Sequence, residues 1–117
     1  MRAIHYSRAV EDWPDELDAL SASAEHHRLL LENDSVRVLE SFIPPGETTA
    51  VHTHRWPNVQ YIVRGTRIVR RNADGAVTSD GELLEESATH WSEPIPPHTV
   101  ENVGDEELRV IVVELKR

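Results

Sequence analysis

Residues 46–65 of the chain read GETTAVHTHRWPNVQYIVRG, with two histidines separated by a single residue. Alternate side chains of a β-strand point to the same face, so His52 and His54 would lie together with Val51 and Thr53 on the opposite face. Imidazole is a common ligand for zinc, copper, nickel and iron. The spacing indicates a candidate metal-binding strand, and the alternative interpretation is a pair of ordinary surface histidines.

Short runs of leucine and β-branched residues, separated by turn formers, continue on both sides of this segment. Asn-Asp at 33–34 and Pro-Pro-Gly at 44–46 end two of these runs, and residues 72–75 and 103–106 are typical of hairpin loops. The pattern predicts an all-β fold, a small antiparallel β-barrel or jelly roll, without the helical segments that a parallel α/β sheet needs. The expected strands are residues 29–31, 36–43, 50–55, 58–63, 66–71, 82–84, 88–92, 98–102 and 108–115.

The beginning of the chain has a different character. Residues 10–24 are acidic and rich in alanine, and Trp13, Leu17 and Leu20 are spaced as in an amphipathic helix. Pro14 suits the first turn of such a helix. We therefore expect an N-terminal helical arm in residues 1–25, packed on the outside of the domain or on a neighbouring subunit, and one β domain in residues 26–117.

Composition narrows the classes of partner and ligand. The 117 residues suit one domain, and 12 Lys and Arg against 21 Asp and Glu give a net charge of −9, which argues against nucleic acid and anionic membranes as partners. The chain has no cysteine, so any metal must be held by His, Asp, Glu or water. The first ten residues lack the apolar run of a signal peptide and no stretch reaches membrane-spanning length, so a cytoplasmic location is expected.

The spacing of residues 46–65 is Gly, five residues, His-x-His, three residues, Asn58, six residues, Gly. It resembles the first motif of the cupin superfamily, with one departure, because Glu usually stands in the place of Asn58. His98, followed four positions later by Asn102, resembles the third histidine of the second cupin motif. The rest of that motif departs from the family, since Ser87, Glu93 and Ile95 stand where the pattern has Gly, Pro and Gly.

The resemblance implies a metal site. His52, His54 and His98 would hold one divalent ion per chain (Fe, Zn, Ni or Mn) at one mouth of the barrel and leave coordination positions open. Asn58 and Gln60 share strand parity and are candidates for a fourth ligand or a substrate contact. The alternatives are a turn residue for Asn58 and a hydrogen bond across the barrel for Gln60.

Other polar residues receive structural interpretations. No spacing connects the remaining histidines to the site, so we interpret them as surface or core residues: His5, His26, His27 and His90. The arginine run of Arg64, Arg67, Arg70 and Arg71 is interpreted as a solvated surface. In a second interpretation Arg67 or Arg37 lies inside and binds a substrate carboxylate.

Two functions follow from these residues. The first is a metal-dependent enzyme that acts on a small anionic metabolite, with dioxygenase-like chemistry as the leading subclass, because three-histidine cupin sites without the glutamate resemble those of iron-dependent thiol and diketone dioxygenases. The second is a non-enzymatic module that binds a metal or a small molecule. The chain looks most like small single-domain cupins associated with β-alanine degradation. A homodimer is expected, since an open barrel leaves strand edges to be covered.

Overall fold

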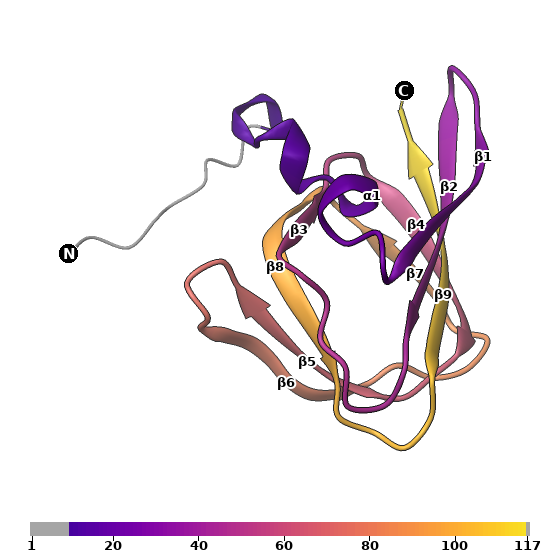
Figure 1. Cartoon of the computed structure of the whole chain (residues 1–117). Helices are drawn as coiled ribbons and strands as arrows, with labels where there is room; N and C mark the ends of the chain where they lie inside the picture. The colour runs from indigo at the N-terminus through magenta and orange to yellow at the C-terminus, as the bar shows by residue number, and fades with distance from the viewer. Residues whose placement is uncertain (1–9, 117) are drawn as a thin grey trace.

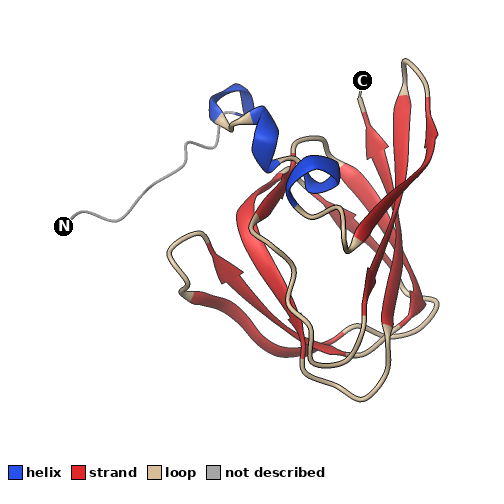
Figure 2. Cartoon of the chain, in the orientation of Figure 1, coloured by secondary structure: helices blue, strands red, loops and turns tan. Residues whose placement is uncertain are grey.

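The computed structural model describes residues 10–116, which form short helical turns followed by strands (Figures 1 and 2). The helical turns are η1 (Val10–Asp12), η2 (Asp15–Leu17) and α1 (Ala19–Ala22). The strands are β1 (His27–Glu32), β2 (Val36–Ile43), β3 (His52–His54), β4 (Asn58–Arg64), β5 (Arg67–Asn72), β6 (Val77–Leu83), β7 (Thr89–Ser92), β8 (Ile95–Asn102) and β9 (Leu108–Leu115). The structure confirms the predicted all-β fold.

The strands form two antiparallel sheets that face each other (Figure 1). One sheet has the order β1-β2-β9-β4-β7 and the other the order β3-β8-β5-β6. No hydrogen-bonded strand pair joins the two sheets within residues 10–116, so the expected small barrel or jelly roll is open at its edges. The fold is thus an open two-sheet jelly roll with its interior between the sheets.

Alternation along the strands creates this interior. In β9, Leu108, Val110 and Val112 are buried, and the intervening residues are only partly buried. Antiparallel strands with one face on a core show this period of two. The apolar core formed in this way consists of Ala19, Leu39, Ile43, Ile62, Ile68, Leu84, Leu108, Val110 and Val112.

The N-terminal arm is helical, but it is not the single amphipathic helix that the spacing predicts. Asp18 has an extended backbone, and its side chain accepts a hydrogen bond from the backbone N–H of Leu20 as the N-cap of α1. A residue in that role lies outside the helix, so no helix runs through it. The three turns gather at one end of the two sheets (Figure 2). No helix in the described part of the chain is long and apolar enough to cross a membrane.

Two glycines fix the segment that carries the paired histidines. Gly46 has a φ of +85°, in the left-handed region that favours glycine. A Cβ on Gly65 would lie 1.8 Å from the carbonyl oxygen of Leu84. Both positions therefore require glycine, one for its backbone conformation and the other for the close approach of a neighbouring loop.

Candidate metal centre

The two histidines of β3 lie on one face, as their spacing predicts. Both side chains are buried, and their ring centroids are 5.2 Å apart. His98 is the direct partner of His52 in the pairing of β3 with β8, and these two ring centroids lie 4.3 Å apart. The ring of His98 is 5.9 Å from that of His54. The structure thus brings together the three histidines to which the sequence assigns the metal.

A further histidine joins them from the opposite sheet. His27 begins β1, and its ring centroid is 4.7 Å from that of His52 and 5.5 Å from that of His54. The potential ligand atoms of His27, His52 and His54 all lie within 4.8 Å of one another. Such a buried group can hold a metal ion. The interpretation of His27 as an ordinary core residue overlooked this position.

Each of the clustered rings uses Nδ1 in a hydrogen bond. The Nδ1 atoms of His52, His98 and His27 donate to the backbone carbonyls of Ala50, Pro96 and Ser23 at 2.8, 2.8 and 3.0 Å. The Nδ1 of His54 donates to Oε2 of Glu114 at 3.0 Å. Because these acceptors carry no proton, each neutral ring holds its hydrogen on Nδ1 and has its lone pair on Nε2. This is the usual arrangement around protein metal ligands, so the residues fit a divalent ion.

Burial keeps the rings of His27, His52 and His98 uncharged. It is the main cause that lowers the pKa of His27 to about 4 and that of His98 to about 3, and in both cases the neighbouring His54 lowers the pKa further. The pKa of His52 also falls far below its ordinary value, mainly through burial and then through the other histidines. Near neutral pH these imidazoles therefore do not need to lose a proton before they bind a metal.

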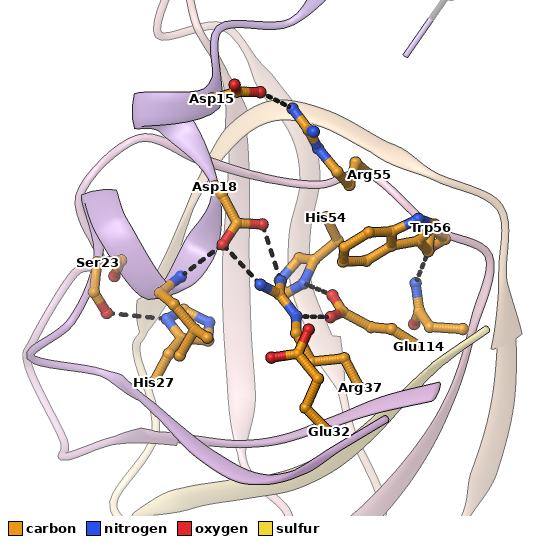
Figure 3. A network of polar contacts seen from close by, with 12 residues as sticks. Asp15, Asp18, Ser23, His27, Glu32, Arg37, His54, Arg55, Trp56 and Glu114 are labelled. Atoms are coloured by element: carbon orange, nitrogen blue, oxygen red, sulfur yellow. Dashed lines mark hydrogen bonds and ion pairs between the residues drawn. The ribbon is translucent and has the colours of Figure 1, made fainter. Parts of the chain in front are cut away.

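A series of charged side chains, connected by hydrogen bonds, leads to Nδ1 of His54 (Figure 3). Oε1 of Glu114 accepts a hydrogen bond from Nε of Arg37 at 2.6 Å. The two terminal nitrogens of Arg37 bind the carboxylate oxygens of Asp18 at 3.0 and 2.8 Å, and its guanidinium lies 4.9 Å from the centre of the Trp56 ring. The chain Asp18, Arg37, Glu114, His54 connects the N-terminal arm to a candidate ligand.

The cavity beside the histidines is small and contains no acidic lining residue from the described part of the chain. Its volume is about 50 Å³, enough for an ion and one or two water-sized groups. Gln60 and Arg70 line it together with His27, His52, His54 and His98. A second cavity of about 320 Å³ shares Gln60 and Arg70 with it and extends to His90 and Trp91. Gln60 and Arg70 thus stand where a small molecule would pass from the larger space to the histidines.

Asn58 and Gln60 occupy different positions. Gln60 faces the cavity, and its Nε2 donates to Oδ1 of Asn58 at 2.9 Å. Asn58 is fully buried, and its Nδ2 donates to the carbonyl of Trp56 at 3.1 Å. The geometry makes Asn58 a support for Gln60, and direct ligation by either amide stays a prediction.

The arginines and histidines with structural interpretations lie partly inside the domain and partly on its surface. Arg37 lies inside the domain, as the second interpretation has it, but both of its ends bind acidic side chains and it does not line the cavity. Arg67 is exposed and donates to the carbonyl of Gly81. His26 is buried and its Nε2 lies 2.9 Å from Oε1 of Glu47, whereas His90 is exposed on β7. His5 lies outside the described residues.

Strand parity gives a signal both for Glu114, which was not among the predicted site residues, and for the inward position of Arg37. Glu114 continues the buried series Leu108, Val110 and Val112, and Arg37 precedes Leu39 at the same spacing on β2. A charge at a core position of a strand indicates a buried ion pair. No such buried series marks His27, because the residues that follow it in β1 are exposed.

The lowered pKa values predict that the metal-free protein is labile to acid. In the unfolded chain these histidines take up protons below about pH 6.5, whereas the folded state resists protonation until about pH 4 or lower. The unfolded state therefore binds more protons, and stability falls as the pH falls through this window. Between about pH 6.5 and 5, each of these histidines lowers the free energy of unfolding by at most about 2 kcal/mol.

Urea unfolding of metal-free protein at several pH values measures this effect. His98→Gln, which removes one titrating ring, should show a shallower loss of stability with acidification than the unchanged chain. Equal slopes for the two proteins would contradict the prediction.

Comparison with solved structures identifies the fold, whereas no protein-family model and no curated protein matches the sequence. A cupin domain from Bordetella pertussis Tohama I is 25% identical, with a TM-score of 0.66 over 78% of this chain and 92% of that one. The polyketide cyclase RemF from Streptomyces resistomycificus is 19% identical, with a TM-score of 0.58 over 100% and 80% of the two chains. The DMSP lyase DddQ from Ruegeria pomeroyi DSS-3 is 14% identical, with a TM-score of 0.57 over 76% of this chain and 45% of that one.

One departure from the family motif has a structural explanation. Ser87, which stands where the second motif has glycine, has a φ of +68° and so keeps the backbone conformation for which glycine is used. The association with β-alanine degradation stays a prediction, since none of these structures bears on it. With two motif glycines that the backbone requires, and with cupins as its structural neighbours, the chain has the fold of the cupin superfamily.

Proposed function

We propose that the chain binds one divalent metal ion through His52, His54 and His98 and acts on a small anionic metabolite. The observation that carries this proposal is the common orientation of the rings, in which every Nδ1 donates to a carbonyl or carboxylate and every Nε2 is left for a metal. Oxygen chemistry of the dioxygenase type is the leading subclass. The cytoplasmic location expected from the sequence stays a prediction.

The charge of the site favours an anionic ligand. Histidine ligands are neutral, and no acidic residue of the described chain lines the cavity, so a divalent ion would keep two net positive charges. When bound, such an ion acts as a Lewis acid and orients the ligand. Arg70 adds a further cation, and the amide of Gln60 is fixed by Asn58 at the entrance. These residues would bind and orient the anion while Leu84 and Ile95 limit its size.

The experiment that tests this proposal begins with metal analysis of protein purified without a polyhistidine tag. We expect about one equivalent of iron, zinc, nickel or manganese per chain. Protein that contains no metal and takes up none of these ions would overturn the proposal. Oxygen uptake by the iron-loaded protein is then measured with thiols and 1,3-dicarbonyls, and loss of substrate is followed with DMSP.

The alternative function is a non-enzymatic cupin that carries a metal or a small molecule. The small volume next to the histidines, about 50 Å³, would suit this function as well. The two functions differ in turnover. A metal-loaded protein that binds anions at the site but consumes neither oxygen nor substrate across the panel would support the carrier and contradict the enzyme.

Arg70 allows a direct test of anion binding with a matched control. Arg70 and Arg71 are neighbours on β5 with side chains 34% and 35% exposed, and each pairs with one glutamate, Glu82 or Glu101. Only Arg70 lines the cavities. Arg70→Gln should weaken the binding of oxalate to the cobalt-loaded protein about tenfold, whereas Arg71→Gln should leave it unchanged. Calorimetry measures both affinities, and equal effects of the two substitutions would contradict the role of Arg70.

We also propose that the protein forms a homodimer through the outer face of the five-stranded sheet. Strand pairing places five apolar residues in one row across this sheet: Leu31, Val38, Val113, Val59 and Trp91. Leu31 and Trp91 at its ends are 54% and 57% exposed. The outward positions of these strands carry only Arg28, Glu40, Arg64 and Arg109 as charges. In a chain of net charge −9, this face carries a single acidic residue, Glu40, at its outward strand positions, so it has little of the negative charge that would repel a second copy.

Sedimentation of two variants, each with one valine replaced by lysine, tests the dimer. Val113→Lys puts a charge in the middle of the apolar row and should shift the protein toward the monomer, with dimer affinity reduced at least tenfold. Val77→Lys adds the same charge on β6 of the other sheet, where Val77 is 51% exposed, and should leave the dimer intact. A monomeric unchanged chain at high protein concentration would refute the proposal.

A further inference from the structure

His27 lies outside both cupin motifs, yet it belongs to the histidine cluster. It is on β1 of the five-stranded sheet, directly paired with Ser41 of β2, whereas His52, His54 and His98 are on the other sheet. Its ring is within 5.5 Å of those of His52 and His54. The cluster therefore spans the interior between the two sheets.

The surroundings of His27 prepare it as a ligand. Only 5% of the residue is exposed, and its Nδ1 donates to the carbonyl of Ser23, at the end of α1 (Figure 3). That bond leaves the lone pair on Nε2, and no side chain or backbone group of residues 10–116 forms a hydrogen bond with this atom. The adjacent His26 points elsewhere, with its Nε2 against Glu47. Two neighbouring histidines thus have different roles.

The cavity also lacks the carboxylate that most cupins place in the first motif. Asn58 stands at that position and uses its amide to bind Trp56 and Gln60. The buried carboxylate of Glu114 accepts hydrogen bonds from Nδ1 of His54 and Nε of Arg37. A metal at this site would thus have only nitrogen ligands from the protein, and the coordination position that the motif glutamate usually fills is left for another ligand.

We propose that His27 is a fourth ligand and completes a four-histidine metal centre that connects the two sheets. This inference rests on the proposed function. It has a consequence for the choice of metal, because four histidines fill a tetrahedral ion and leave no position for substrate. A six-coordinate ion keeps two positions, enough for a bidentate anion. Zinc in tetrahedral geometry would then be structural, and iron, manganese, nickel or cobalt would leave the centre open.

The test compares His27→Ala with His26→Ala in the full chain. Cobalt(II) is the probe, because its visible absorption reports the number and type of ligands. We expect His27→Ala to bind one cobalt ion at least tenfold more weakly and with an altered spectrum, and His26→Ala to match the unchanged protein. Free imidazole should restore the spectrum of His27→Ala, since it fits the space left by the side chain. If the alanine variant does not fold, His27→Gln replaces it.

The outcomes separate this inference from the proposed function. If the unchanged protein binds no cobalt, the proposed function fails and the inference fails with it. If the unchanged protein binds cobalt, His98→Ala loses it, and His27→Ala keeps both affinity and spectrum, then a three-histidine centre is correct and the fourth ligand is overturned. Weaker binding, a changed spectrum and rescue by imidazole together support the four-histidine centre.

Discussion

Replacing His52 by alanine should lower the affinity for divalent metals by about a hundredfold or more, the largest effect expected of any single substitution in this protein. His52 occupies the centre of the cluster, with the rings of His27, His54 and His98 at 4.7, 5.2 and 4.3 Å. Substitutions that only disturb the partner of a metal ligand cost tenfold to a hundredfold. Loss of a central ligand should cost at least as much.

The affinity is measured by competition with a chromophoric chelator, and the metal content by elemental analysis. His90→Ala is the control, because His90 is an exposed histidine of the same chain that lies outside the cluster. Circular dichroism checks that both variants fold, which we expect because the apolar core consists of other residues. A folded His52→Ala variant with the metal affinity of the unchanged chain would show that the ion binds elsewhere.

The strands could be predicted because their signals are local. The expected strands at residues 36–43 and 108–115 agree with β2 and β9. Turn formers end the first of these runs and precede the second, and the β-branched and other apolar residues within them favour strands. That His52 and His54 lie on the same face was predictable for the same reason, since it depends only on the geometry of one strand.

His27 could not be found in this way, because its place in the cluster depends on how two sheets pack. It is separated from His52 by β2 and the loop that follows, and the histidines meet only when β1 and β3 lie on opposite sides of the interior. Whether the two sheets close into a barrel could not be predicted for a related reason. Closure depends on pairing between the edges of distant strands, which no local pattern encodes.

The arm shows how one polar contact changes a local prediction. The apolar spacing of Trp13, Leu17 and Leu20 suits a helix, but Asp18 caps α1 and binds Arg37 of β2. Both contacts hold Asp18 in an extended conformation, and the helix is divided there. Tertiary contacts of this kind regularly override helical propensity.

Glu114→Gln is expected to remove most of the metal affinity even though it changes the size of the side chain little. The carboxylate accepts two hydrogen bonds, from Arg37 and from Nδ1 of His54. Glutamine has one acceptor oxygen and one NH₂ group, so one of these contacts would bring two donors together. The clash is relieved if His54 moves its proton to Nε2, but that proton then occupies the lone pair needed by the metal.

We expect metal affinity to fall tenfold to a hundredfold, as for other partners of metal-bound histidines. The metal-free protein should also lose about 1–3 kcal/mol in urea unfolding, because a buried hydrogen bond is lost. Arg37 keeps its two bonds to Asp18, which limits the loss. Nitrogen chemical shifts of the His54 ring report which nitrogen carries the proton.

Glu40→Gln is the matched control for this substitution. Glu40 is a buried glutamate of β2 that pairs with Arg28 and Arg109, and its side chain contacts no histidine of the cluster in the described structure. The control should lose stability but keep the affinity for metal and the Nδ1 proton of His54. If Glu114→Gln behaves in the same way, Glu114 serves only to neutralise Arg37. The other outcome is a loss of metal affinity confined to Glu114→Gln, with the proton of His54 moved to Nε2. That result would show that this chain, which has Asn58 in place of the usual cupin glutamate, uses the carboxylate of Glu114 to orient the metal ligand His54.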